Sequence, residues 1–198
     1  MYVLRKENHM VITIGREYGS GGHETGRLLA KRLNLEFYDK VRLIEKTKEL
    51  HCEEEMYSFL NEMPADSLLY SIAMEDTGHK PGSYPFRFLR KLAEQESFVL
   101  VGRCGNVALR ECPDATSVFL HGRTEARIKR LELTQGMSEH AAQKAIRKTD
   151  MDRRRFHEYY GGEEWGLARN YQLCIDSTIL GPEATAGLIC DYLERAGR

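Results

Sequence analysis

Five short apolar runs alternate along the chain with longer segments that mix apolar and charged residues. Each run is rich in β-branched or aromatic residues and has the length of a buried strand; they cover residues 10–15, 35–39, 97–103, 116–122 and 171–178. Helical periodicity fills most of the sequence between them. Because strands that alternate with helices form parallel sheets, the pattern predicts an α/β fold with a mostly parallel five-stranded sheet covered on both faces.

Three helices are predicted in the carboxyl-terminal half of the chain. The first covers residues 123–133, and the second begins with Ser138 as N-cap and runs toward residue 146. The last helix has Pro182 at its first position, where the missing N–H costs nothing. Its inward-facing residues are predicted to be Leu188 and Leu193.

Two segments do not fit a simple strand–helix alternation. Residues 41–95 have a mostly helical pattern, interrupted by a Gly- and Pro-containing loop over residues 77–85. Residues 150–166 are charged, aromatic and glycine-containing, with no single period. Ligands of open α/β sheets bind at the carboxyl ends of the strands, so we expect both segments to lie over that edge.

Composition and charge describe one globular domain over residues 1–198. Hydrophobic residues make up 41% and charged residues 30%, and the net charge is −1. No overall field attracts nucleic acid or an anionic membrane, so any anion site must be local. No apolar run approaches the roughly 20 residues of a membrane span. Residues 1–10 lack the apolar core of a signal peptide, and Met10 could itself be the start.

The five cysteines are odd in number and contain no CxxC pair, which argues against a disulfide framework and a zinc site. Free thiols in the cytoplasm are the simpler interpretation.

A glycine-rich loop connects the first strand to the first helix in the sequence TIGREYGSGGHETG, residues 13–26. Glycines in such a loop let backbone N–H groups turn toward an anion, and the helix N-terminus adds partial positive charge. Aligned with the pattern GxxxxGK[ST], Arg16 stands at the first glycine, Gly22 at the lysine and His23 at the hydroxyl residue. A tight packing turn is the alternative for this stretch alone.

Arginines could supply the charge of the missing lysine, because guanidinium groups match phosphate geometry. Arg16 stands where the loop begins and could contact phosphate or pair with Glu17. Arg103 follows the third strand directly, at its carboxyl end. Asp150 and Arg153 are spaced i,i+3 on one helical face, where a solvated run of charges is the alternative.

Other polar and aromatic residues leave their roles open. Asp39 ends the second strand and could bind a ligand or cap the next helix. Ser20 and Thr25 are candidates for magnesium, but neither has the usual spacing. Arg123, Arg127 and Arg130 have spacings of four and three, which place them on one helical face, and a solvent-exposed face is one interpretation of them. We interpret Trp165 and Tyr171 as packing residues.

Several motifs in order resemble the cytidylate-kinase-like family, a branch of the P-loop nucleoside monophosphate kinases. They are GREYGSGGHETG with LEFYDK, then VLVGRCGNVAL, SVFLHGRTEARIKRL, TDMDRRRFHEYYGGEEWG and NYQLCIDSTILGPEA. The likeness covers nearly the whole chain except residues 41–95. Two features depart from true cytidylate kinases, which carry the loop lysine and have an aspartate where this chain has Val101.

The resemblance implies a three-layer P-loop NTPase fold with a helical acceptor-binding insertion at 41–95 and a lid at 148–168. It implies ATP and Mg²⁺ as cofactors and small-molecule nucleotides as partners; the metal ligands are unknown and a homodimer is left open. It also implies that some of Arg123, Arg127 and Arg130 support the donor nucleotide or the lid. The nearly balanced charge predicts no nucleic-acid or membrane partner. The expected site residues are Arg16, Arg153 and Arg154 for catalysis; Gly19, Ser20, Gly21, Gly22, His23 and Glu24 for the ATP phosphates; and Asp39, Arg103, Asp150 and Arg153 for the acceptor.

Two classes of function follow from these expectations. One is an ATP-dependent kinase for a nucleoside monophosphate such as cytidylate, or for another small acceptor. The other is a nucleotide-binding sensor or partner protein with little or no kinase activity, which the absence of the loop lysine favours.

Overall fold

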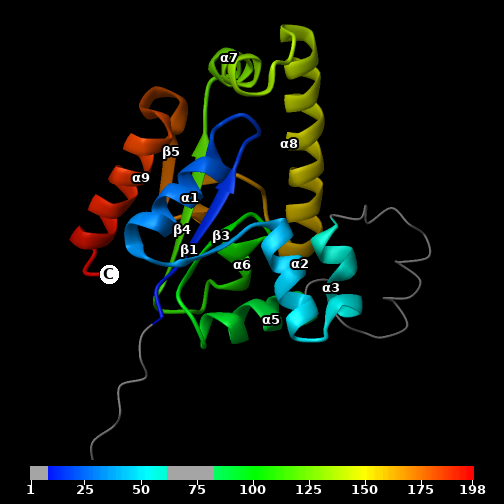
Figure 1. The fold of residues 1–198 in the computed structure, drawn as a ribbon, viewed down its shortest axis with the longest axis vertical. Helices are drawn as coiled ribbons and strands as arrows, with labels where there is room; N and C mark the ends of the chain where they lie inside the picture. Colours follow the sequence, from blue (N-terminus) through cyan, green and yellow to red (C-terminus); the bar gives the residue numbers. More distant parts are fainter. Residues whose placement is uncertain (1–8, 62–82) are drawn as a thin grey trace, which may run out of the picture.

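A five-stranded sheet forms the centre of the protein (Figure 1). The structure is a computed structural model that describes residues 9–61 and 83–198. All strand pairings are parallel, which confirms the predicted sheet. The spatial order is β2 (Glu36–Tyr38), β3 (Phe98–Val101), β1 (Val11–Arg16), β4 (Ala115–His121) and β5 (Leu173–Asp176). Parallel pairing places the carboxyl ends of the strands at one edge, where the glycine loop begins.

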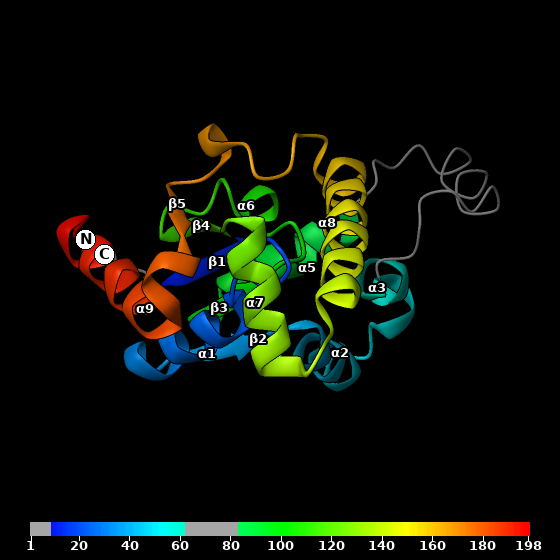
Figure 2. The same ribbon diagram turned by 90° about the horizontal axis from the view of Figure 1, so that it is seen from above.

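Helices cover both faces of the sheet (Figures 1 and 2). On one face, α1 (Gly22–Leu33) and α9 (Ser177–Arg195) pack on the side chains of Ile12 and Ile14. Val11 alternates to the opposite face. The helices there are α2 (Lys40–Glu49), α3 (Glu53–Leu60), α5 (Ser83–Ala93) and the short α6 (Gly105–Ala108).

Two further helices extend past the carboxyl edge of the sheet. Helix α7 (Thr124–Gln135) and helix α8 (Glu139–Gly161) share a small core that includes Ile128 and Ile146, with Tyr18 of the glycine loop packed against it. Ser138 caps α8 as predicted, since its hydroxyl accepts a hydrogen bond from the Ala141 N–H. A loop then leads through a 3-10 turn, η1 (Ala168–Asn170), to β5.

Some predicted boundaries were wrong. Most of the segment 150–166 is helical, because α8 runs to Gly161 with polar as well as apolar side chains on its buried face. The fifth strand ends at Asp176, whose side chain caps α9. In that helix Leu188 is 42% exposed, and Ile189 is the buried residue. The predicted loop 77–85 ends earlier than expected, because α5 begins at Ser83; residues 77–82 lie outside the described residues.

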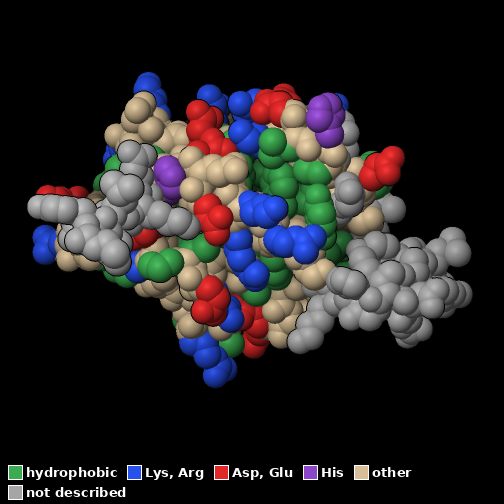
Figure 3. Space-filling model, turned by 90° about the horizontal axis from the view of Figure 1, so that it is seen from below, with side chains coloured by type: hydrophobic (Ala, Val, Ile, Leu, Met, Phe, Trp, Pro, Cys, Tyr) green, Lys and Arg blue, Asp and Glu red, His purple; other side chains and the backbone are tan. Residues whose placement is uncertain are grey.

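Figure 3 shows the molecule from the amino ends of the strands, opposite the glycine loop. Lys and Arg side chains lie near the centre of this face, next to exposed hydrophobic side chains. At this end α5 exposes Arg87, Arg90 and Lys91. Among the described residues, no helix combines the length and apolar character that crossing a membrane requires. All five cysteines are free thiols.

Candidate functional site

The glycine loop turns sharply between β1 and α1. Gly19 and Gly21 adopt φ values of 82° and 81°, in the left-handed region that favours glycine. The first intrahelical hydrogen bond is donated by the Thr25 N–H to the Gly21 carbonyl, at 2.9 Å. The N–H groups of Gly22, His23 and Glu24 therefore have no carbonyl partner within the helix, and they form the positive end of its dipole.

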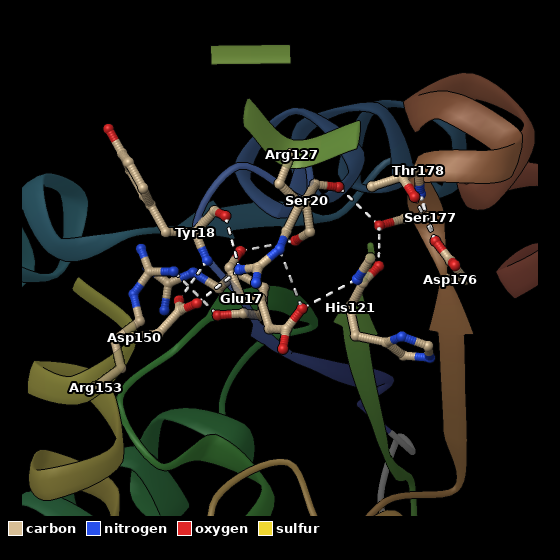
Figure 4. A network of polar contacts seen from close by, with 12 residues as sticks. Glu17, Tyr18, Ser20, His121, Arg127, Asp150, Arg153, Asp176, Ser177 and Thr178 are labelled. Atoms are coloured by element: carbon tan, nitrogen blue, oxygen red, sulfur yellow. Dashed lines mark hydrogen bonds and ion pairs between the residues drawn. The ribbon is translucent and has the colours of Figure 1, made fainter. Parts of the chain in front are cut away.

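A partly buried ion pair fixes this loop to α7 and α8 (Figure 4). Arg127 donates a hydrogen bond to Asp150 Oδ2 at 2.6 Å and another to the Tyr18 carbonyl at 3.2 Å. The second carboxylate oxygen of Asp150 accepts from the Tyr18 N–H at 2.7 Å. Solvent exposure is thus the wrong interpretation for Arg127, which is 6% exposed.

The other side of the loop is held by β4 and α9 (Figure 4). Glu17 accepts a hydrogen bond from the Gly122 N–H at 3.0 Å, and its carboxylate lies 3.5 Å from Nε of Arg127. The Ser177 hydroxyl lies 2.7 Å from the Ser20 carbonyl oxygen, to which it donates. Contacts from both sides therefore hold the loop in this conformation.

The side chain of Arg16 crosses the space beside Gly22. A Cβ atom placed on Gly22 would lie 2.7 Å from both Cβ and Cγ of Arg16, closer than real contacts allow. Farther along, Nη1 of Arg16 lies against Gly102 at the end of β3. Gly22 occupies the position of the P-loop lysine and Arg16 that of its first glycine. Arginine and glycine have thus exchanged places, and the Arg16 stem fills the space where the lysine side chain would begin.

A cleft of about 220 Å³ opens between the glycine loop and α7. Three arginines line it together with the loop glycines: Arg16, Arg130 and Arg153. The Arg130 guanidinium lies over Gly21 and pairs with Glu24. Arg153 donates to the Arg16 carbonyl at 3.0 Å, and its guanidinium lies 5.7 Å from the Tyr18 ring centre. Backbone N–H groups and guanidinium groups in one cleft make a site for a polyanion.

The turn after β3 has an unusual backbone. Gly102, Arg103 and Cys104 have φ values of 82°, 58° and 49°, and left-handed backbone is unfavourable for arginine and cysteine. The turn places Arg103 in the interior, where it donates to the Phe59 carbonyl at 3.3 Å and lies 5.6 Å from the Phe156 ring centre. Arg103 therefore lies beneath α8 at the carboxyl end of the sheet.

A second, much smaller cavity of about 20 Å³ adjoins the cleft. Arg16 and Arg153 line both spaces, and Arg103 and His157 line the smaller one. The Thr13 hydroxyl is buried at this cavity and has no hydrogen-bond partner within the described residues. An unpaired buried hydroxyl is costly, so a ligand atom or water is its natural partner.

His157 is a buried histidine on the inner face of α8. Its Nε2 lies 3.6 Å from Oε1 of Glu163, and Glu163 in turn accepts hydrogen bonds from Asn106 at 3.0 Å and from Arg110 at 2.5 Å. Burial lowers the pKa of His157 below its ordinary value, against the opposing effects of Glu163 and Glu158 and with a small contribution from Arg110. The imidazole is therefore neutral near pH 7.

Acidification is expected to destabilise the fold through His157. In the unfolded chain this histidine binds a proton near pH 6.5, whereas the folded protein binds it only at lower pH. The free energy of unfolding should therefore fall below pH 6.5, by at most about 1.4 kcal/mol per pH unit for this one proton. Urea unfolding at a series of pH values measures the slope. It should be smaller in His157→Gln and unchanged in His140→Gln, an exposed histidine of the same helix. Equal slopes in wild type and His157→Gln would contradict the assignment.

Asp39 and His23 contact each other at the end of β2. Asp39 caps α2 by accepting from the Arg42 N–H at 2.9 Å, which confirms the capping interpretation. Partial burial opposes its ionisation, yet this bond and the His23 side chain at 2.9 Å hold the pKa of Asp39 below its ordinary value. His23 is thus directed toward Asp39, with its ring edge-on to Phe37.

Hydroxyl groups near the loop are engaged with the backbone. Thr25 donates to the Gly21 carbonyl at 3.1 Å and Ser20 to the Glu17 carbonyl at 2.8 Å. In residues 9–61 and 83–198, no three His, Cys, Asp or Glu side chains are arranged to hold a metal.

The remaining predicted residues lie at the periphery of the site. Arg154 is exposed, with its guanidinium 5.9 Å from the centre of the Trp165 ring. Trp165 and Tyr171 pack on Phe119, as the packing interpretation predicted. Arg123 precedes the first residue of α7 and is exposed.

Sequence reasoning missed Thr13, His157 and Glu163. Had residues 150–161 been predicted as a helix, His157, four residues after Arg153, would have been expected on the same face as that arginine. Thr13 and Glu163 give no such signal, because only the fold brings them to the cavity.

Sheet order, glycine loop and covering helices together define a P-loop kinase fold. The chain belongs to the cytidylate kinase-like family, whose model matches residues 11–179. A search of curated proteins gave no significant match.

Several solved structures share this fold. An uncharacterized protein from Eubacterium ventriosum is 29% identical, with a TM-score of 0.70 over 94% of this chain and 99% of that one. Shikimate kinase from Bacteroides thetaiotaomicron has a TM-score of 0.52 at 16% identity, over 93% and 98% of the two chains. Shikimate kinase from Acinetobacter baumannii, solved in complex with shikimate, has a TM-score of 0.53 at 15% identity, over 96% of each chain. At these identities the shikimate kinases share the fold alone.

Proposed function

We propose that the protein is an ATP-dependent kinase that phosphorylates a small acceptor, with the donor phosphates bound in the cleft of the glycine loop. The observation that carries this proposal is the path of Arg16 through the space of the P-loop lysine. A guanidinium there supplies the positive charge that phosphoryl transfer needs. The exchange of arginine and glycine keeps the cationic centre rather than removing it.

Arg103 and Arg153 are proposed to hold the acceptor. Both line the small cavity next to the donor cleft, at the carboxyl ends of β1 and β3. A nucleoside monophosphate such as CMP is the first acceptor to test, because of the family, and shikimate is the second, because of the fold. A cytoplasmic location and Mg²⁺ with the nucleotide belong to the same proposal.

The role proposed for Asp150 differs from the acceptor contact that the sequence predicted. Both of its oxygens accept bonds within the protein, from Tyr18 and Arg127. We propose that it positions the glycine loop and that its predicted contact with the acceptor is secondary.

A nucleotide-binding protein without turnover is the second candidate, because the loop has glycine at the lysine position. One experiment separates the two. Purified protein, ATP and Mg²⁺ are incubated with CMP, UMP, AMP and shikimate, ADP formation is followed, and ATP affinity is measured by calorimetry.

The kinase proposal expects acceptor-dependent ADP formation that is lost in Arg103→Ala while ATP affinity is retained. Arg27→Ala, an exposed arginine of α1, is the matched control and should behave as wild type. ATP binding without turnover on a broad acceptor panel would favour the second candidate. Absence of ATP binding would contradict both.

A further inference from the structure

The pair of His157 and Glu163 has the arrangement of a catalytic base and its orienting carboxylate. The His157 side chain is 5% exposed and the Glu163 side chain 17%. Hydrogen bonds from Asn106 and Arg110 hold the Glu163 carboxylate beside Nε2 of the imidazole. Nε2 lies just beyond hydrogen-bond distance of this carboxylate and has no other hydrogen-bond partner among the described residues. A slightly closer approach lets the neutral imidazole donate from Nε2 to Glu163, which leaves the lone pair on Nδ1. That nitrogen can accept a proton.

His157 itself lines the small cavity next to the proposed site of phosphoryl transfer. His157 lines the small cavity with Arg16, Arg103 and Arg153, and two of these arginines also line the donor cleft. His157 shares this cavity with three arginines, and an apolar side chain would fill the same space without burying a polar ring.

The chemistry of the acceptor decides whether a base is useful. A phosphate acceptor loses its second proton near pH 6 and arrives as a ready nucleophile. A hydroxyl group keeps its proton at neutral pH, so its transfer to a base assists the reaction, as the catalytic aspartate does in protein kinases. A base in the cavity therefore favours an alcohol over a phosphate as the acceptor group.

We propose that His157 is the general base of this kinase, oriented by Glu163, and that the acceptor is a hydroxyl group of a small anionic molecule. The proposal rests on the kinase function above. As the acceptor oxygen bonds to the γ-phosphorus, its proton moves to Nδ1 of His157. The bond between the γ-phosphorus and the β–γ bridging oxygen breaks, and its electron pair leaves with ADP.

A larger pocket gives the acceptor room. The small cavity holds about one water molecule. The neighbouring pocket of about 470 Å³ shares four lining residues with it: Thr13, Gly105, Asn106 and Tyr171. Arg110 and Arg169 line the larger pocket, so a carboxylate or phosphate group of the acceptor suits it. The buried Thr13 hydroxyl at the boundary is placed to bind the reacting alcohol.

The test compares acceptors and variants in the full-length protein. Shikimate, D-glycerate and ribose 5-phosphate serve as hydroxyl acceptors, and CMP, UMP and AMP as phosphate acceptors. ATP affinity, melting temperature and kcat are measured for wild type, His157→Gln, Glu163→Gln, Glu163→Asp and the control His140→Gln. Arg169→Ala tests the larger pocket.

We expect phosphorylation of a hydroxyl acceptor and a loss of kcat of roughly 10²–10⁴-fold in His157→Gln at unchanged ATP affinity. In wild type, kcat should fall at acidic pH as His157 is protonated. The charged groups around it are Glu163, Glu158 and Arg110, with Arg16, Arg103 and Arg153 across the cavity. Glu163→Gln should lower kcat and move this limb to lower pH, and Glu163→Asp should restore part of both. Arg169→Ala should raise the KM of the acceptor at nearly constant kcat.

The outcomes distinguish failure of the general-base inference from failure of the kinase function. Phosphorylation of a monophosphate with full kcat in His157→Gln would overturn this inference and leave the kinase function standing. Normal pH dependence in a well-folded Glu163→Gln variant would also overturn it. Absence of ATP binding or of any acceptor-dependent turnover would overturn the kinase function and this inference with it.

Discussion

Replacing Arg16 with alanine is expected to lower kcat/KM for ATP by about 10²–10³-fold, the usual effect of removing one preorganised donor to transition-state charge. The Arg16 stem lies beside Gly22 and its guanidinium reaches Gly102. No lysine in the loop itself could compensate, because residues 17–23 contain none. Steady-state kinetics on the best acceptor give the value, and Arg27→Ala is the control that removes the same charge from the same region.

Exchanging the residue types at positions 16 and 22 tests this role of Arg16 more directly. Gly22→Lys alone should be harmful, because the new side chain would begin 2.7 Å from Cβ and Cγ of Arg16. The double variant Arg16→Gly/Gly22→Lys should recover to within roughly tenfold of wild type, since a P-loop lysine is also a good phosphate ligand. If the double variant is no better than Arg16→Ala, Arg16 does not stand in for the lysine.

Replacing Asp150 with asparagine is expected to lower the free energy of unfolding by roughly 3 kcal/mol, because the mostly buried Arg127 then keeps only the Glu17 carboxylate, at 3.5 Å, as an anionic partner. For a chain of this size the melting temperature should fall by about 6–12 °C. Urea unfolding and calorimetry measure the two quantities. Asp152→Asn, the same change at an exposed position of α8, should alter stability by no more than about 0.5 kcal/mol.

The same variant separates two roles of Asp150. If the residue mainly holds the glycine loop through Tyr18, its loss should weaken ATP binding as well as stability. A normal melting temperature together with a raised KM for the acceptor alone would instead support the direct contact expected from the sequence.

Much of the fold follows from patterns that act locally. Five apolar runs gave five strands, because buried parallel strands need uninterrupted apolar side chains. The spacing of glycines placed the loop before any contact was known. The helix over residues 150–161 was harder to predict, because its inner face carries Arg153 and His157 next to Phe156 and Tyr160. A helix that faces a polar site loses the apolar stripe by which helices are recognised.

Candidate site residues could be proposed from the sequence where a residue type suggests one chemistry. Their surroundings could not, because tertiary contacts determine which side chains are buried and which line the cleft. Arg16 was predicted to contact phosphate from its place before the glycines, and only the structure shows its stem in the space beside Gly22. Arg127 and Arg130 have similar sequence surroundings and different environments. Arg127 is buried against Asp150, and Arg130 lines the cleft beside the glycine loop.

The contact between Asp150 and the Tyr18 backbone also limits how the domain can move. The predicted lid begins at residue 148, so the hydrogen bonds of Asp150 connect its first turn to the glycine loop and to Arg127. A rigid-body swing of α8 would have to break that connection or drag the loop along. The hinge of any closing motion is therefore best sought after Gly161, where the helix ends and Gly162 adopts a φ of 66°.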